Sequence, residues 1–176
     1  MNEIKKLNQP KFDAIKALNL PLGHYAIASS GALGIRNLRI INDIDIIVTK
    51  ELWDTLAKQY GITTENGFNR IVFPDGIVEA ISNSSFYEDE NAPSIITRIA
   101  NADIIEGLPF ETLDDVIHFK QQMGREKDLA DILLINAYTS KSKESHPPPH
   151  KRFLNKNLEC GNSVTAFTLN PTLAGF

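Results

Sequence analysis

The chain has 176 residues, of which 42% are hydrophobic and 23% charged, and this suits one globular domain with its own core. The net charge of −4 argues against bulk attraction to nucleic acid or to an anionic membrane and leaves room only for a local basic site. Cys160 is the single cysteine, which excludes an intramolecular disulfide and a cysteine-based zinc cluster.

The first part of the chain alternates helical and extended patterns. Residues 8–21 place apolar side chains on one helical face, and Pro10 suits the first turn of that helix. Residues 24–29 predict a short apolar strand, and residues 30–36 predict a glycine-containing turn that opens a short helix. Residues 41–48 predict the next strand, in which apolar residues alternate with aspartates.

The middle of the chain predicts a helix followed by a hairpin. The helix covers residues 51–61, with Thr49 as its N-cap and Gly61 as its C-terminal stop. Two apolar runs, residues 68–73 and 77–82, flank the sequence PDG, a strong turn signal, and we expect them to pair as a β-hairpin.

The pattern over residues 94–110 is mixed and assigns no element. A helix follows over residues 112–124, with Thr112 as N-cap and Asp115 three residues later, as in a capping box. The last predicted helix covers residues 125–138. This order of elements predicts a mixed α/β (α+β) domain in which helices flank a small mixed sheet, with helices at its C-terminal end.

The composition changes after Ser140, where a polar, proline-rich stretch begins. We therefore expect a folded domain over residues 1–140 and a linker with a disordered tail over 141–176. The polar start of the chain lacks the apolar core of a secretory signal, and no run approaches the roughly 20 apolar residues of a membrane span. These features predict a cytoplasmic protein without a membrane partner.

Asp43 and Asp45 share one face of the strand predicted over 41–48. Their separation of roughly 6 to 7 Å implies a repulsion of about 2 to 3 kcal/mol at an effective dielectric of about 20. A divalent cation between the carboxylates would turn this repulsion into attraction, and oxygen ligands favour Mg²⁺ or Mn²⁺. The alternative is a solvated acidic strand end. Glu79, a lone acid in an apolar strand, is the candidate third metal ligand, and the alternative is a charge on an edge strand. Asp75 is a weaker candidate ligand, because aspartate is common in turns such as PDG.

Small residues lie upstream, where a strand is expected to meet a helix. Backbone N–H groups at such a junction bind phosphate, and small side chains allow its approach. The Ser29 and Ser30 hydroxyls and the Gly31 backbone are the candidate contacts, and Arg36 or Arg39 would supply charge. Phosphates beside a carboxylate-bound metal imply phosphoryl or nucleotidyl transfer. A plain strand-to-helix turn is the alternative.

Residues 29–48, SSGALGIRNLRIINDIDIIV, resemble the signature of the nucleotidyltransferase superfamily related to DNA polymerase beta, in which a small-residue turn precedes an Asp-hydrophobic-Asp/Glu pattern. Residues 107–132 resemble the C-terminal part of its small bacterial members, the toxin-type and antibiotic-modifying nucleotidyltransferases. Those members often carry a lysine before an Arg-x-Lys-Asp-x-x-Asp-Ile run. The matching residues here are Lys120, Arg125, Lys127, Asp128 and Asp131. The resemblance covers residues 25–138.

The resemblance implies a nucleotidyltransferase fold in which the aspartate pair binds metal and the serine-glycine turn holds the nucleotide phosphates. It also implies that the lysine-aspartate helix lies near the nucleotide or the acceptor. From the residues alone, Lys127 and Asp131 equally suit a helix-stabilising i,i+4 pair, and Asp128 suits a first helical turn. Lys120 reads as a solvated helix residue.

The leading hypothesis is an enzyme that transfers a nucleoside monophosphate from a nucleoside triphosphate to an acceptor hydroxyl and releases pyrophosphate. The expected metal ligands are Asp43, Asp45 and Glu79, the expected nucleotide contacts are Ser29, Ser30, Gly31, Arg36 and Lys127, and Glu79 or Asp128 would act as general base. The acceptor stays open among a small molecule, a protein side chain and an RNA 3′ end. A partner protein or a homo-oligomer fits so short a chain.

Ser29 stands where the family usually has its first glycine. This departure motivates an alternative in which a weak or inactive member acts as a regulatory or binding protein, for example a toxin–antitoxin component. Nucleic-acid binding as the main role is less favoured because the chain has no basic stripe.

Overall fold

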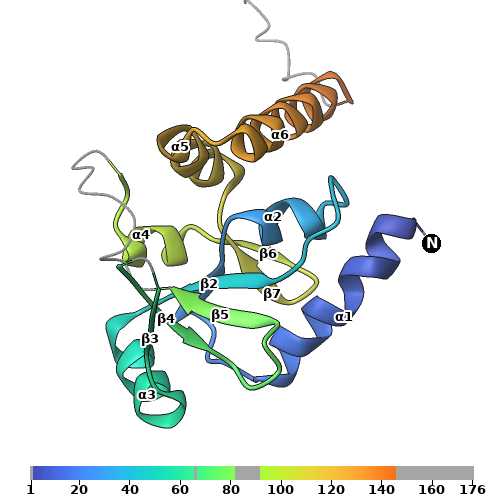
Figure 1. Ribbon diagram of the computed structural model, residues 1–176. Coiled ribbons are helices and arrows are strands. Elements are labelled where there is room, and N and C mark those ends of the chain that lie inside the picture. The colour runs from blue at the N-terminus through green and yellow to red at the C-terminus, as the bar shows by residue number, and fades with distance from the viewer. Residues whose placement is uncertain (1, 66, 82–91, 146–176) are drawn as a thin grey trace, which may run out of the picture. The chain divides into compact units, whose positions relative to one another are not determined.

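A computed structural model describes residues 2–65, 67–81 and 92–145 of the chain. Within these residues, seven strands form one mixed sheet in the spatial order β3-β4-β5-β2-β1-β7-β6 (Figure 1). The strands are β1 (Tyr25–Ile27), β2 (Ile44–Val48), β3 (Thr63–Glu65), β4 (Phe68–Val72), β5 (Val78–Ile81), β6 (Asp103–Ile105) and β7 (Leu108–Phe110). The helices are α1 (Glu3–Ala17), α2 (Ser30–Ile35), α3 (Lys50–Tyr60), α4 (Ile95–Ala100), α5 (Leu113–Met123) and α6 (Glu126–Ser145). The predicted mixed α/β class is confirmed.

Side chains of the central strand β2 alternate between two faces of the sheet. Ile44, Ile46 and Val48 belong to the main hydrophobic core, which includes apolar residues of α1 and α3. Ile47 belongs to a smaller cluster with residues of β1 and α4. Because Asp45 shares the face of Ile47, its carboxylate is directed away from the main core.

The first helix begins at Glu3, before the start predicted at residue 8, and ends at Ala17. Asn2 caps it, since its side chain accepts a hydrogen bond from the backbone N–H of Ile4 at 3.1 Å. Pro10 therefore lies inside the helix, and its predicted place in the first turn is wrong. The helix starts earlier because the Asn2 cap lies eight residues before Pro10.

The strand predicted over residues 41–48 is shorter than expected, because β2 begins at Ile44. Pairing with β5 starts where Ile44 lies opposite Val78, the first residue of β5. The residues before Ile44 therefore have no paired residue in β5. Asp43 consequently lies just before the strand and is exposed, which corrects the expectation that both aspartates lie within the strand.

The hairpin expected around the PDG turn is confirmed, as β4 and β5 pair antiparallel with Val72 opposite Glu79. Asp75 accepts a hydrogen bond from the backbone N–H of Ile77 at 2.9 Å, which is an ordinary turn contact. The helix caps are confirmed as well. Thr49 and Thr112 accept hydrogen bonds from their helices, and Gly124 adopts the left-handed conformation at the end of α5.

The unassigned residues 94–110 form α4 and the β6–β7 hairpin. Glu106 and Gly107 make the hairpin turn, both with positive φ (51° and 80°), as two-residue turns require. β7 then pairs parallel with β1 and extends the sheet beyond the size expected. Strands of three residues are too short to show a periodicity of two.

The last helix, α6, continues to Ser145, so residues 141–145 are helical and not a linker as expected. Residues 146–176, the rest of the predicted tail, lie outside the described part of the chain. The buried side of α6 carries Asp128, Asp131 and Ile135. Among the described residues, no helix combines the length and the apolar character needed to cross a membrane.

Candidate functional site

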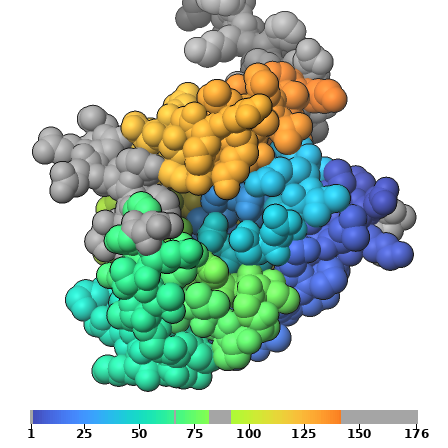
Figure 2. Space-filling model, viewed as in Figure 1, coloured from blue at the N-terminus to red at the C-terminus, as the bar shows by residue number. Residues whose placement is uncertain are grey.

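A cavity of about 720 Å³ opens on the face of the sheet that carries Asp45. Its walls come from the turn after β1, the first residue of α2, the strands β2, β4 and β5, the three helices α4 to α6 and nearby connecting segments. The surface is hollowed below the gold and orange helices α5 and α6 (Figure 2). Among the expected site residues, the cavity is lined by Ser29, Ser30, Arg39, Asp43, Asp45, Glu79, Lys127 and Asp128. Gly31, Arg36 and Asp75 do not line it.

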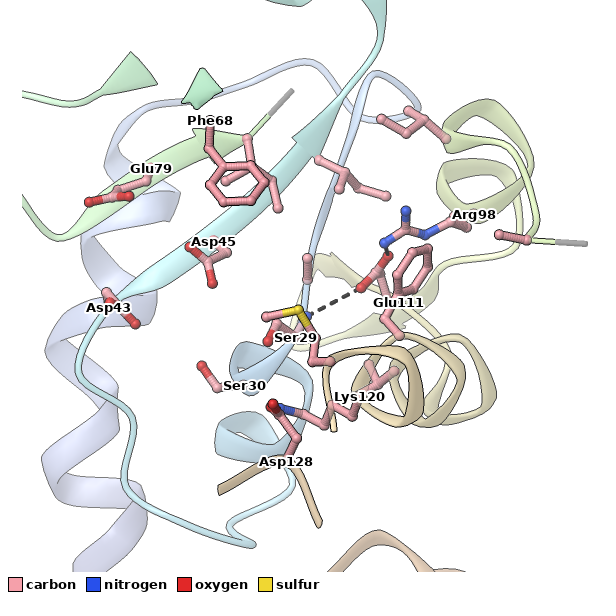
Figure 3. A pocket seen from close by; sticks show the side chains of 18 of the residues that line it. Ser29, Ser30, Asp43, Asp45, Phe68, Glu79, Arg98, Glu111, Lys120 and Asp128 are labelled. Carbon is pink, nitrogen blue, oxygen red and sulfur yellow. Dashed lines mark hydrogen bonds and ion pairs between the residues drawn. The ribbon is translucent and has the colours of Figure 1, made fainter. Parts of the chain in front are cut away.

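Three acids occupy one side of the cavity, with Asp45 directly opposite Glu79 on the paired strands β2 and β5 (Figure 3). The pKa of Asp45 is raised to about 7, mainly by burial and further by the negative charges of Asp43 and Glu79. The positive charges of Arg70 and Lys120 partly oppose this rise. Ionisation of Asp45 in this cavity is therefore unfavourable unless a positive charge binds beside it.

Glu79 is engaged by Arg70 of β4, whose guanidinium Nη1 lies 3.0 Å from a Glu79 carboxylate oxygen. Arg70 also lies 3.3 Å from Glu65. In the described ranges, no three Asp, Glu, His or Cys side chains are grouped closely enough to hold one metal ion. The structure thus brings Asp43, Asp45 and Glu79 to one cavity, as expected, but the Glu79 carboxylate is paired with Arg70.

Ser29 forms the turn between β1 and α2 with φ 51° and ψ −123°, a conformation that glycine adopts far more readily than serine. Its backbone N–H donates to Glu111 Oε2 at 3.2 Å. Ser30 begins α2 and lines the cavity.

Gly31 lies behind this turn, where its backbone N–H donates to the Ala28 carbonyl at 3.1 Å. A Cβ atom on Gly31 would fall well inside van der Waals distance of Ile27 Cγ2. The structure therefore gives Gly31 a packing role, and its N–H is used within the turn.

Lys120 lies across the cavity from the acids, and Ser29 and Ser30 lie between the two sides (Figure 3). It is buried, with Nζ 3.2 Å from Asp128 Oδ1 and 2.8 Å from Asp131 Oδ2. The expectation of a solvated Lys120 is wrong, because the two aspartates of α6 face α5 and require a cation.

Burial of Asp128 would raise its pKa, but hydrogen bonds from Arg125 and Lys120 outweigh burial and hold the pKa below its ordinary value. Arg125 Nε lies 2.6 Å from Asp128 Oδ2. Asp131 pairs with Lys120 and with Arg39 Nε at 2.9 Å, and Lys127 is exposed at the cavity wall. Arg36 lies elsewhere and binds Asp103 at 2.5 Å.

Arg98 and Glu111 also line this cavity, and neither was predicted from the sequence. They form a buried ion pair, and the Arg98 guanidinium lies 3.9 Å from the centre of the Phe119 ring. Burial raises the pKa of Glu111, while Arg98 and the Ser29 N–H partly offset that effect. The available signal for Glu111 was a lone acid directly after the apolar run Leu108–Phe110, which is weaker than the acid within an apolar strand that indicated Glu79.

The arrangement combines three acids and two serine hydroxyls with a cationic wall formed by Arg39, Lys120, Arg125 and Lys127. The four positive charges of this wall outnumber the two aspartates that pair with it, Asp128 and Asp131. Such a site suits a polyanion that arrives with a divalent cation, because each partner meets charge of the opposite sign. In comparisons with known proteins, no family model, no curated protein and no solved structure matched the chain, so the interpretation depends on this geometry.

Proposed function

We propose that the protein is a metal-dependent nucleotidyltransferase that moves a nucleoside monophosphate from a nucleoside triphosphate to an acceptor hydroxyl. The observation that carries this proposal is the placement of Asp43 and Asp45 across one cavity from Lys120, with Ser29 and Ser30 between them. A triphosphate has the negative charge to match the cationic wall, and its bound cation matches the acids.

Asp43 and Asp45 would hold Mg²⁺ or Mn²⁺, helped by Glu79 when it leaves Arg70. These residues fit such an ion in two ways. They offer oxygen donors alone, and burial together with the charges of Asp43 and Glu79 raises the pKa of Asp45, an effect that a bound divalent cation would oppose. Mg²⁺ commonly binds through one or two carboxylates together with substrate phosphates. The ion would supply electrostatic stabilisation of the charge that develops during phosphoryl transfer.

The chain's own residues would orient the triphosphate and move one proton. The Ser29 and Ser30 hydroxyls donate to phosphate oxygens, and Lys120 and Lys127 lower the negative charge of the pyrophosphate leaving group. The acceptor oxygen forms a bond to the α-phosphorus, the bond from that phosphorus to the bridging oxygen breaks, and pyrophosphate departs.

The acceptor proton passes to Glu79 in this scheme. Both carboxylate oxygens of Asp128 are occupied by Lys120 and Arg125, and its lowered pKa makes it a weak base. Asp128 is therefore assigned to holding Lys120 in place. Glu79 is partly exposed at the cavity and has one ion-pair partner, Arg70, among the described residues.

Label transfer tests the proposed reaction. The protein is incubated with Mg²⁺ and each nucleoside triphosphate, labelled at the α or the γ position, together with pools of small-molecule, protein and RNA acceptors. The proposal predicts label on an acceptor from the α position only and release of pyrophosphate. The Asp43→Asn, Asp45→Asn variant should lose transfer, and the control variant Asp13→Asn, Asp54→Asn, altered at exposed acids of α1 and α3, should keep it. Transfer by the first variant at the wild-type rate would contradict the proposal.

A second candidate is a regulatory protein on the same architecture, for instance a toxin–antitoxin component. It is favoured by the turn at Ser29, where two backbone N–H groups, those of Ser29 and Gly31, bind protein oxygens and not a ligand. Such a protein would capture its partner from the native host equally well with or without the Asp43→Asn, Asp45→Asn change.

A further inference from the structure

The buried pair formed by Arg98 and Glu111 joins three parts of the cavity wall. Glu111 follows β7 and directs one carboxylate oxygen to the Ser29 backbone N–H at 3.2 Å (Figure 3). Its other oxygen pairs with Arg98 of α4, and Arg98 lies over the Phe119 ring of α5. Arg98 is 7% exposed and Glu111 is 1% exposed, so water does not compete for this contact.

The contact is directed at a turn whose backbone conformation is unfavourable for the serine that it contains. The φ of 51° and ψ of −123° at Ser29 crowd its Cβ, and a serine without an external restraint would leave this region for an extended or helical conformation. A charge-assisted hydrogen bond to the Ser29 N–H is such a restraint.

The ion pair with Arg98 also removes the repulsion that Glu111 alone would exert on a bound phosphate. A lone carboxylate beneath the turn would repel a bound phosphate, but the Arg98 charge neutralises Glu111 and leaves its hydrogen-bonding capacity intact. Arg98 is in turn held by Phe119, so the carboxylate is fixed from two sides.

We propose that Glu111, held by Arg98, is a positioning residue that fixes the Ser29 turn in its positive-φ conformation and so presents the Ser29 and Ser30 hydroxyls to the phosphates of the triphosphate. This inference rests on the proposed function for the identity of the ligand only. Without Glu111 the turn relaxes, and the serines lose their common orientation toward the cavity.

A double-mutant cycle with Ser29→Gly tests this role, because glycine accepts the observed φ and ψ without a Cβ clash. Binding of Mg²⁺ with each nucleoside triphosphate is measured by calorimetry. Glu111→Gln should weaken binding about tenfold in the Ser29 background and less than twofold when Ser29→Gly is also present. If Glu111 serves only the stability of the fold, both backgrounds lose the same factor, and that result would overturn the proposal.

A second readout needs no nucleotide. In the free wild-type protein, the Ser29 amide proton should exchange slowly with solvent. In Glu111→Gln, the NMR resonance of this amide should shift, and its protection against exchange should fall at least tenfold. Unchanged protection at Ser29 overturns the proposal. Should Glu111→Gln fail to fold, Arg98→Lys, which keeps the charge and loses the guanidinium geometry, is measured in the same way and should give a partial loss. If the wild type binds no triphosphate, the proposed reaction fails, and the Ser29 amide still decides the positioning role.

Discussion

Asp45→Asn should stabilise the protein above neutral pH. Burial and the neighbouring acids raise the pKa of Asp45 from 3.8 to about 7 in the folded state, so ionisation of this carboxylate favours the unfolded chain. The stability that Asp45 contributes is fully present below its unfolded pKa and is lost progressively as the pH rises through 7.

The rise in pKa sets the magnitude, at about 1.4 kcal/mol for each pKa unit, or about 4 kcal/mol in total. Relaxation of the native state and loss of attraction to nearby cations reduce the expected gain for Asp45→Asn to about 2 to 4 kcal/mol at pH 8. Below pH 4, where wild-type Asp45 is protonated in the folded protein, the two proteins should differ by less than about 1 kcal/mol.

Urea denaturation followed by circular dichroism at pH 4, 6 and 8 measures the difference directly. Asp13→Asn on α1 is the matched control, since Asp13 is exposed and its change should alter the stability at pH 8 by less than about 0.5 kcal/mol. Adding Mg²⁺ at pH 8 should raise the stability of the wild type and not of Asp45→Asn. An Asp45→Asn protein no more stable than the wild type at pH 8 would refute the reasoning.

Three further changes test the scaffold of the site. Asn8→Leu should cost about 3 kcal/mol in chemical denaturation, because the buried Asn8 amide makes three hydrogen bonds to the backbone of α2 and of the loop before β2, and leucine leaves those groups unsatisfied. Asn8→Leu within about 0.5 kcal/mol of wild type would contradict this account. Gly31→Ala should cost about 1 to 3 kcal/mol by thermal denaturation, since the new methyl overlaps Ile27, and an unchanged melting temperature would count against it. Lys120→Met should cost about 3 kcal/mol, the low end for a broken buried pair, because the facing aspartates keep their arginine partners. Asp128→Asn in the Lys120→Met background should restore part of that loss, and an additive further loss would disprove the pairing.

Local signals predicted much of the fold. The side chains of Thr49 and Thr112 cap their helices, and Gly61 and Gly124 end them, because capping depends on a few neighbouring atoms. The β6–β7 hairpin escaped prediction, since its short strands are defined by pairing with β1 and by a turn that lacks the usual Asn-Gly signal.

The residues of the site likewise fall into those that a local signal predicted and those that depend on contacts between distant elements. One contiguous stretch predicted Ser29, Ser30, Asp43 and Asp45, because the spacing of its small residues and the alternation of its acids are visible in the sequence alone. The burial of Lys120 depends on α5 and α6 packing together, and no local pattern encodes that contact. The pair of Arg98 and Glu111 likewise exists only once α4 and the end of β7 meet.

The central claim is that the acids and the cationic wall bind a metal–triphosphate complex together. Calorimetric titration of the wild type with the four ribonucleoside triphosphates, with and without Mg²⁺, tests it most directly, beside the Asp43→Asn, Asp45→Asn variant. We predict binding of at least one triphosphate that requires Mg²⁺ and that the variant loses. Binding that is indifferent to Mg²⁺ and to the variant, or no binding of any triphosphate, would contradict the account.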